Sequence, residues 1–153
     1  MSTTFTQLWL YNNWANTVVL EKLKKEGEKT PHSCLRLFSH IVNAQAIWLS
    51  RLIGEKIPVG VWDEHSISDC QRYHQLTSEG FAQQIQGIKD TDNKIATYTN
   101  TQHQAFHNKV NDILLHVFNH GTYHRAQIAS EMRRNGVEPI NTDYITFIRL
   151  KQY

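Results

Sequence analysis

The sequence predicts an all-α protein: a four-helix bundle with a short hairpin-like excursion before the last long helix and a short C-terminal helix. Apolar residues recur three and four positions apart over four long segments, which is the spacing of one helix face. Glycine, proline or capping side chains lie at the ends of these segments, as is typical of helix termini. No internal repeat or shift in composition divides the 153 residues. We therefore expect a single domain, residues 1–153, whose helices pack around one core.

The first helix is expected between Phe5 and Gly27. One of its faces is formed by Phe5, Leu8, Asn12, Ala15 and Val19. The second is expected to open with Thr30 as its cap and Pro31 in its first turn, where a missing N–H costs little. It carries Leu37, Ile41, Ala44, Trp48 and Leu52 on one face and ends at Gly54. Residues 54–65 then predict a loop.

The third helix is expected from Ser68, whose spacing from Gln71 fits a capping box, to about Lys89. Its inner face is formed by Cys70, Tyr73, Thr77, Phe81, Ile85 and Ile88. The next segment, "KIATYTNTQHQAFHN", is rich in β-branched and aromatic residues. That composition predicts two short strands around Asn100.

The fourth helix is expected from Asn108, as its cap, to Gly136. Beyond Pro139, the segment "NTDYITFIRLKQY" predicts a short terminal helix. Four amphipathic helices of this kind favour a bundle, in whose interior side chains from facing helices can meet.

Composition narrows the possible partners and compartments. Sixteen basic and fourteen acidic residues leave a net charge of +2, without the basic stripe of a nucleic-acid-binding protein. No apolar run reaches the roughly 18 residues of a membrane span, and the N-terminus lacks a signal-peptide pattern. Cys34 and Cys70 are isolated, so we expect small buried hydrophobes in a reducing, cytoplasmic setting. We expect neither nucleic acid nor membrane as a partner.

The stretch "LLHVFNHGTYHRAQI" places His116, His120 and His124 four residues apart in the fourth helix. Residues four apart lie about 40° apart around a helix. His124 falls within the apolar stripe, His120 on its shoulder and His116, about 80° from His124, at its rim. His120 and His124 can therefore point into the bundle together.

A catalytic zinc site commonly has three protein ligands, so a third ligand is expected from another helix. His40, beside the apolar face of the second helix, is the best placed candidate. The other histidines lie at a helix start, in loops or in the hairpin segment, or follow an inward residue by one position. Two histidines at this spacing also occur in helices without a metal, and geometry alone leaves both interpretations open.

The same residues resemble a known family. "LLHVFNHGTYHRAQI" resembles the signature of the DinB/YfiT-like superfamily, a run of the form H-x-x-N-H-x-x-x-H-R-x-Q-I in the last bundle helix. "FSHIVNAQAIWLSRL" is similar to its second motif, a ligand histidine followed by A-x-x-x-W-L, and "TDYITFIRL" is similar to its closing segment. The resemblance extends from about residue 5 to the C-terminus.

The resemblance implies a four-helix bundle, usually a homodimer, with a three-histidine site for a divalent metal. By position, the ligands are His40, His120 and His124, while His116 matches a histidine that often precedes the pair without being a ligand. Zinc or nickel is expected first, with iron or manganese as further candidates. Near His40, where a carboxylate would be a useful neighbour, the chain has Gln45.

Three functions compete. Some relatives are thiol-dependent transferases or isomerases, which implies a metal-dependent enzyme acting with bacillithiol, mycothiol or glutathione. A metal-dependent hydrolase is the second possibility, but Gly121 stands where a zinc peptidase carries its glutamate. The third is a non-enzymatic, metal-stabilised binding protein of a stress response.

Tyr123 and Arg125 flank His124 in the sequence, and both side chains are expected to point away from the metal. We expect Arg125 to pair across the bundle rather than to hold a substrate carboxylate.

Overall fold

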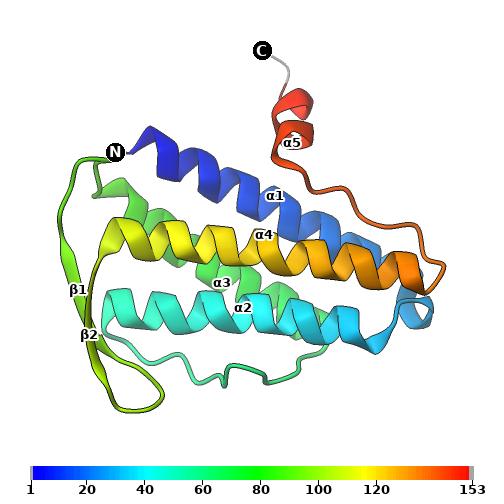
Figure 1. Cartoon of the computed structure of the whole chain (residues 1–153), viewed down its shortest axis with the longest axis horizontal. Coiled ribbons are helices and arrows are strands. Elements are labelled where there is room, and N and C mark those ends of the chain that lie inside the picture. The colour runs from blue at the N-terminus through cyan, green and yellow to red at the C-terminus, as the bar shows by residue number, and fades with distance from the viewer. Residues whose placement is uncertain (1, 152–153) are drawn as a thin grey trace.

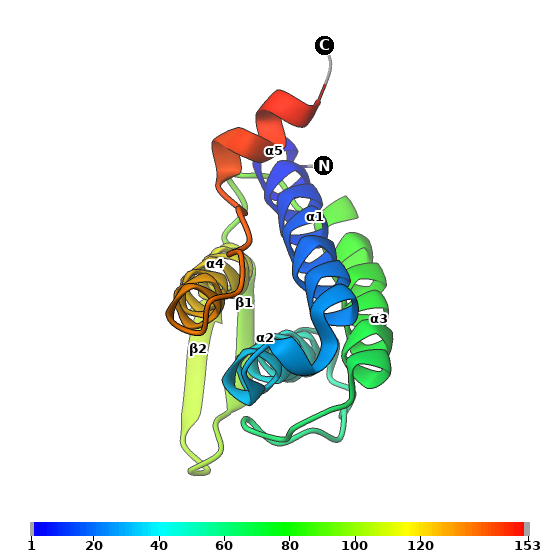
Figure 2. The same ribbon diagram turned by 90° about the vertical axis from the view of Figure 1, so that its right-hand side faces the viewer.

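Four long helices lie side by side in the computed structural model, which describes residues 2–151 (Figure 1). They are α1 (Thr3–Glu26), α2 (His32–Ile53), α3 (Ile67–Gln86) and α4 (Val110–Arg134). A 3₁₀ turn (Gly27–Lys29) joins α1 to α2. In the end-on view of Figure 2 the long helices surround the core, and α5 (Tyr144–Leu150) lies outside it. The all-α prediction is confirmed.

The ends of α1 and α2 follow simple capping chemistry. The Ser2 hydroxyl accepts a hydrogen bond from the Phe5 amide, 2.9 Å away, and so satisfies one of the free N–H groups at the start of α1. At the end of α2, Gly54 adopts a left-handed conformation with φ of 74°, and its amide donates to the Ser50 carbonyl. Only glycine takes this conformation without strain, which explains why α2 ends there.

The three helix starts predicted from polar side chains were wrong by one or two residues. Pro31 directly precedes α2, which has no side-chain cap, and the Thr30 hydroxyl donates instead to the Gly27 carbonyl. Ser66, rather than Ser68, caps α3 and accepts from the Asp69 amide.

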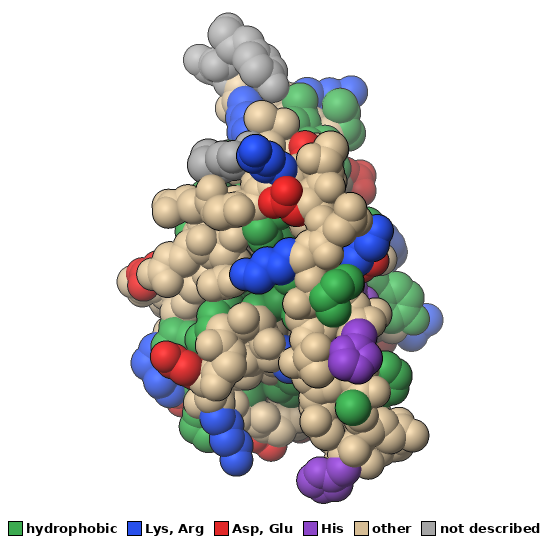
Figure 3. All heavy atoms as spheres, turned by 90° about the vertical axis from the view of Figure 1, so that its left-hand side faces the viewer, with side chains coloured by type: hydrophobic (Ala, Val, Ile, Leu, Met, Phe, Trp, Pro, Cys, Tyr) green, Lys and Arg blue, Asp and Glu red, His purple; other side chains and the backbone are tan. Residues whose placement is uncertain are grey.

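Asn108 does not cap α4 because it belongs to the preceding strand. Its side-chain oxygen accepts from the Tyr98 hydroxyl at 2.8 Å, and Lys109 then leads directly into α4. The strands are β1 (Ile95–Thr99) and β2 (Ala105–Lys109), antiparallel with Thr97 opposite His107. The predicted hairpin around Asn100 is confirmed. It crosses the end of the bundle shown in Figure 3, where hydrophobic, charged and histidine side chains are interspersed.

The core has two apolar regions with a polar layer between them. Towards the turn between α1 and α2 the apolar residues include Val19, Leu23, Phe38, Val42, Ile128 and Met132. Towards the hairpin they include Phe5, Leu49, Phe81, Ile113 and Phe118. The residues between are buried and polar: Asn12, Asn16, Gln45, Thr77 and Arg125. This layer ties all four long helices together at the level of the histidines described below.

The buried faces of α2 and α3 differ in detail from the predicted ones. Leu37 and Trp48 are only partly buried, whereas Phe38 and Gln45 lie deep in the core. This follows because α2 contacts both α3 and α4 and buries a wider arc than one stripe. On α3 it is His74, not Tyr73, that is buried.

The short helix α5 rests on α1 through aromatic contacts. The Phe147 ring packs 5.8 Å from that of Tyr11 and 5.6 Å from that of Trp14. The Tyr11 hydroxyl donates to the Thr142 carbonyl just before α5. The predicted terminal segment continues to residue 153, and residues 152–153 lie outside the described part. Within residues 2–151, none of the helices has the length and apolar character needed to span a membrane.

Candidate metal centre

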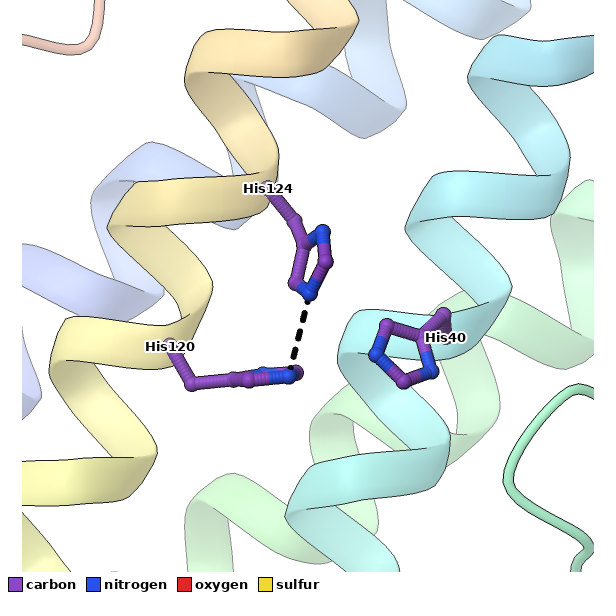
Figure 4. A group of neighbouring side chains, drawn as sticks. All are labelled: His40, His120 and His124. Atoms are coloured by element: carbon purple, nitrogen blue, oxygen red, sulfur yellow. Dashed lines mark hydrogen bonds between the residues drawn. The ribbon is translucent and has the colours of Figure 1, made fainter.

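Two long helices bring three histidines together inside the bundle. His120 and His124 project from successive turns of α4, and His40 faces them from α2 (Figure 4). One ring nitrogen from each lies within 4.8 Å of those of the others. The ring centroids are 4.4 to 4.9 Å apart. The structure therefore places the three predicted ligand residues in one cluster of a size that could hold a metal ion.

Hydrogen bonding fixes the orientation of the His40 ring. Its Nδ1 lies 2.9 Å from the carbonyl oxygen of Val61. A carbonyl only accepts, so the proton is on Nδ1 and Nε2 carries the free lone pair. Metal-binding histidines commonly donate their other N–H to a carbonyl or carboxylate in this way. His40 is therefore held ready to bind through Nε2.

The loop after α2 is itself held by Asn43. The Asn43 amide donates to the carbonyls of Val61, at 3.4 Å, and Asp63, at 2.7 Å. Between these two carbonyls, the Trp62 ring stacks on His40 with the centroids 3.9 Å apart and the planes 10° apart. The loop thus presents both a carbonyl and an aromatic face to His40.

His124 is oriented in a similar way from within its own helix. Its Nδ1 lies 2.7 Å from the side-chain oxygen of Gln127, one turn later. Its Nε2 lies 3.1 Å from Nε2 of His120. With the proton of His124 on Nδ1, its Nε2 lone pair points toward His120 and the space between α2 and α4.

Burial keeps two of the rings neutral. It lowers the pKa of His120 to about 3, with a smaller contribution from the neighbouring His124, His40 and His116. It also lowers the pKa of His40, although the hydrogen bond to Val61 acts in the opposite direction. Neutral imidazole is the form that binds metal ions, since the proton and the metal compete for one lone pair.

His116 lies outside the cluster, at the rim position that the helical wheel predicts. Its ring centroid is 5.7 Å from that of His120 and 5.2 Å from the Trp48 ring, which it meets edge to face. It is one turn further from His40 than His120 is, and its ring packs against α2 at Trp48 instead.

Arg125 pairs across the bundle, as expected. The guanidinium is fully buried, and its Nη1 donates to the side-chain oxygens of Asn12, at 3.0 Å, and Asn16, at 2.7 Å. Gly121 makes this approach possible: a Cβ there would lie 2.7 Å from Arg125 Nη1. The Gly-x-x-x-Arg spacing within the histidine motif is thus structural. Tyr123 is 63% exposed and lies on the outside of α4.

Gln45 also belongs to the polar layer. Its oxygen accepts from both Asn12 and Asn16, and its amide donates to Thr77. The loop acids Asp63 and Glu64 and the two cysteines do not belong to the histidine cluster. Asp63 accepts from the Gly60 amide, and Glu64 contacts His32. Burial raises the pKa of the Cys34 and Cys70 thiols to about 11, so they are uncharged at neutral pH.

Several residues of the site were not predicted from the sequence. Asn43 and Gln127 each follow a cluster histidine by three residues, and that spacing was the available signal. The Val61 carbonyl and Trp62 come from an irregular loop, where no periodicity indicates which group meets His40.

The donor set suits a transition metal. Three uncharged nitrogen donors, two of them with their second nitrogen already hydrogen-bonded, match the ligand type and number of catalytic zinc sites. Among the described residues, no carboxylate or thiol lies in this cluster. Nitrogen ligands of this kind favour zinc, nickel, iron or copper over magnesium or calcium.

A helical bundle with a three-histidine cluster between two of its helices defines a class of candidate metalloproteins. Residues 1–152 match the model of the DinB family. The chain is also 26% identical to Protein DinB of Bacillus subtilis (strain 168) over 155 residues, covering 90% of each protein. The chain belongs to the DinB family.

Proposed function

We propose that His40, His120 and His124 bind one divalent transition-metal ion and that the protein is a metal-dependent enzyme acting on a low-molecular-weight thiol. Zinc and nickel are the favoured ions, iron also suits imidazole donors, and manganese is a further candidate. The observation that carries the proposal is the convergence of three ring nitrogens within 4.8 Å, with two of the rings held by hydrogen bonds on their other nitrogen. A histidine that merely filled the core would also form hydrogen bonds, but it would not need the ring nitrogens of two other histidines beside it.

The chemistry depends on the charge of the donors. Three neutral imidazoles leave a bound divalent ion its full charge, which favours the deprotonation of a thiol or water that binds it. A thiol such as bacillithiol, mycothiol or glutathione would then be available as a thiolate for transfer to an electrophile. The protein supplies three neutral donors, and Val61, Gln127 and Trp62 keep the His40 and His124 rings in place.

A hydrolase is less well supported. Metal-dependent peptide hydrolysis commonly uses a carboxylate as its base, and Gly121 stands where a zinc peptidase helix carries that glutamate. Two acids follow Trp62 in the loop after α2. Asp63 accepts from the Gly60 amide, and Glu64 contacts His32. A thiolate nucleophile needs no such base once the thiol is deprotonated.

Thiol conjugation measured with and without metal tests the proposal. Chelator-stripped and metal-loaded protein are each incubated with a reference electrophile and a panel of thiols. We expect turnover only when both the metal and a thiol are present. Equal conjugation by the stripped and loaded proteins would contradict a metal-dependent enzymatic function. Metal binding without turnover of any thiol would favour a non-enzymatic, metal-stabilised stress-response protein.

We also propose that the protein is a cytoplasmic homodimer. The two buried cysteines, Cys34 and Cys70, are free thiols, which suits a reducing compartment. Exposed apolar side chains on α5, Ile145 and Leu150, offer surface that a second copy would cover. Light scattering coupled to size exclusion gives the mass directly, and a monomer at all accessible concentrations would contradict the dimer.

A further inference from the structure

Arg51, in the last turn of α2, lies against two aromatic rings. Its guanidinium carbon is 4.4 Å from the ring centroid of Trp48 on α2 and 4.6 Å from that of Tyr98 on β1. The two rings also meet each other edge to face, with their centroids 5.3 Å apart, so the guanidinium rests against an aromatic pair formed by α2 and the hairpin. Cation–π contacts with both rings restrict the orientation of the planar group.

No acidic partner meets this cation. Within the described residues, Arg51 has neither a hydrogen bond nor a salt bridge, although the residue is partly buried. Arg36, on the same helix, shows the contrast. Its guanidinium lies 5.1 Å from the Trp62 ring and 3.8 Å from the Glu64 carboxylate. Two arginines of α2 thus each face a tryptophan, and only Arg36 also has a carboxylate.

A series of aromatic contacts connects Arg51 to the histidine cluster. Trp48, which stacks on Arg51, also meets the His116 ring at 5.2 Å, and His116 lies 5.7 Å from His120. Arg51 and His116 therefore lie on the hairpin side of the cluster, while Arg36 and Trp62 lie on the other side. A molecule bound at the cluster and extending toward the hairpin would reach a fixed, uncompensated positive charge.

We propose that Arg51 is a specificity-determining residue that binds the carboxylate of the molecule held at the metal centre. The inference rests on the proposed function, because it assumes that a ligand occupies that centre. A planar guanidinium with unused N–H groups matches the two oxygens of a carboxylate. Its partial removal from water strengthens the attraction. Trp48 and His116 link Arg51 to the cluster through their ring contacts, and a ligand that reaches both would lie beside them.

The test uses metal-loaded protein and matched pairs of thiols. Each pair consists of an ω-mercapto carboxylic acid and the ω-mercapto alcohol of the same chain length, over a series of lengths. Binding is measured by calorimetry, with and without the metal. We expect the wild-type protein to prefer the acid by about tenfold or more at the matching length, because hydrogen bonds to charged groups contribute about 1.5–3 kcal/mol.

Two variants separate the role of Arg51 from a general effect of charge. Arg51→Gln should bind acid and alcohol equally, while binding the alcohol as the wild type does. Arg36→Gln removes the same charge from the same helix and should keep the preference. Arg51→Lys keeps the charge without the planar guanidinium and should retain only part of the preference for the acid. Circular dichroism confirms that each variant is folded.

The possible results separate the role of Arg51 from the proposed thiol-dependent function. Equal binding of acids and alcohols by the wild type, with metal-dependent binding of both, overturns the role of Arg51 alone. So does a full preference for the acid in Arg51→Gln. If no thiol binds in a metal-dependent way, the proposed function fails, and the inference falls with it.

Discussion

The Nε2 atoms of His120 and His124 face each other at 3.1 Å across one turn of α4. Two neutral imidazoles this close are stable only if one donates a proton to the other or both lone pairs are shared with a cation. His124 already holds its proton on the opposite nitrogen, toward Gln127. This arrangement, opposite His40, is the basis of the proposed metal site.

Replacement of the histidines one at a time should separate ligands from neighbours. His120→Ala removes one of three donors, and we expect metal affinity to fall by more than about 100-fold, because even the loss of a supporting residue costs about 10–100-fold. His116→Ala, one turn away and outside the cluster, should change it little. Isothermal titration with zinc measures both, and the reverse order of effects would show that the ligands are wrongly assigned.

Asn43 is expected to act on the metal through His40. Asn43→Leu removes the amide that holds the Val61 and Asp63 carbonyls, so the loop no longer fixes the His40 ring. Affinity for zinc should fall by about tenfold with the helical content unchanged. Asn108→Leu serves as the control, because it removes an asparagine hydrogen bond in the hairpin, away from the cluster. Identical affinities in the two variants would exclude a role for the loop.

Gly121 is required by packing. A Cβ there would lie 2.7 Å from Arg125 Nη1 and 3.0 Å from the Asn12 side-chain oxygen. Gly121→Ala should therefore lower the free energy of unfolding by about 1–2 kcal/mol, despite the gain of about 1 kcal/mol in helix propensity. At Gly87 a Cβ meets nothing within 4 Å, so Gly87→Ala should stay within about 0.5 kcal/mol of the wild type. Urea titrations compare the two, and equal stabilities would contradict the steric explanation.

His74 should make stability depend on pH. Burial, and then the nearby Arg125 charge, lower its pKa from 6.5 to about 4 in the folded protein. As the pH falls below 6.5, the His74 imidazole becomes protonated in the unfolded chain but stays neutral in the folded chain. Its contribution to stability is therefore present above pH 6.5 and is lost as the pH falls to about 4, by at most about 1.4 kcal/mol per pH unit.

The comparison with His74→Gln isolates this effect from that of the cluster histidines. Unfolding free energies of both metal-free proteins are measured between pH 4 and pH 7 by chemical denaturation. The wild-type curve should fall more steeply on the acid side. Parallel curves would mean that His74 is protonated equally in both states.

The sequence was most informative where periodic patterns carry the structure. The four long helices and the hairpin follow from apolar spacing and β-branched composition, and the wheel angle separated His116 from His120 and His124. The starts of helices were predicted less well. Ser66 and Ser68 offer the same capping chemistry, and only the tertiary fold chooses between them. Asn108 was predicted as a helix cap, whereas it belongs to a strand and pairs with Ala96, twelve positions away.

The polar interior could not be predicted for a related reason. Arg125 was expected to pair across the bundle, but its partners on α1 could not be named from the sequence. Gln45 is buried because it meets partners from α1 and α3, and no local pattern indicates such partners. The same holds for Trp62, whose stacking on His40 depends on the path of an irregular loop.

The number of divalent metal ions that chelator-stripped protein takes up per chain shows whether the three histidines form a metal site. Titration with zinc should reach one ion per chain in the wild type. It should find none in a variant in which His40, His120 and His124 are all alanine. Failure of the folded wild-type protein to bind zinc, nickel, iron or manganese would show that the three histidines are not a metal site, as would undiminished binding by the triple variant.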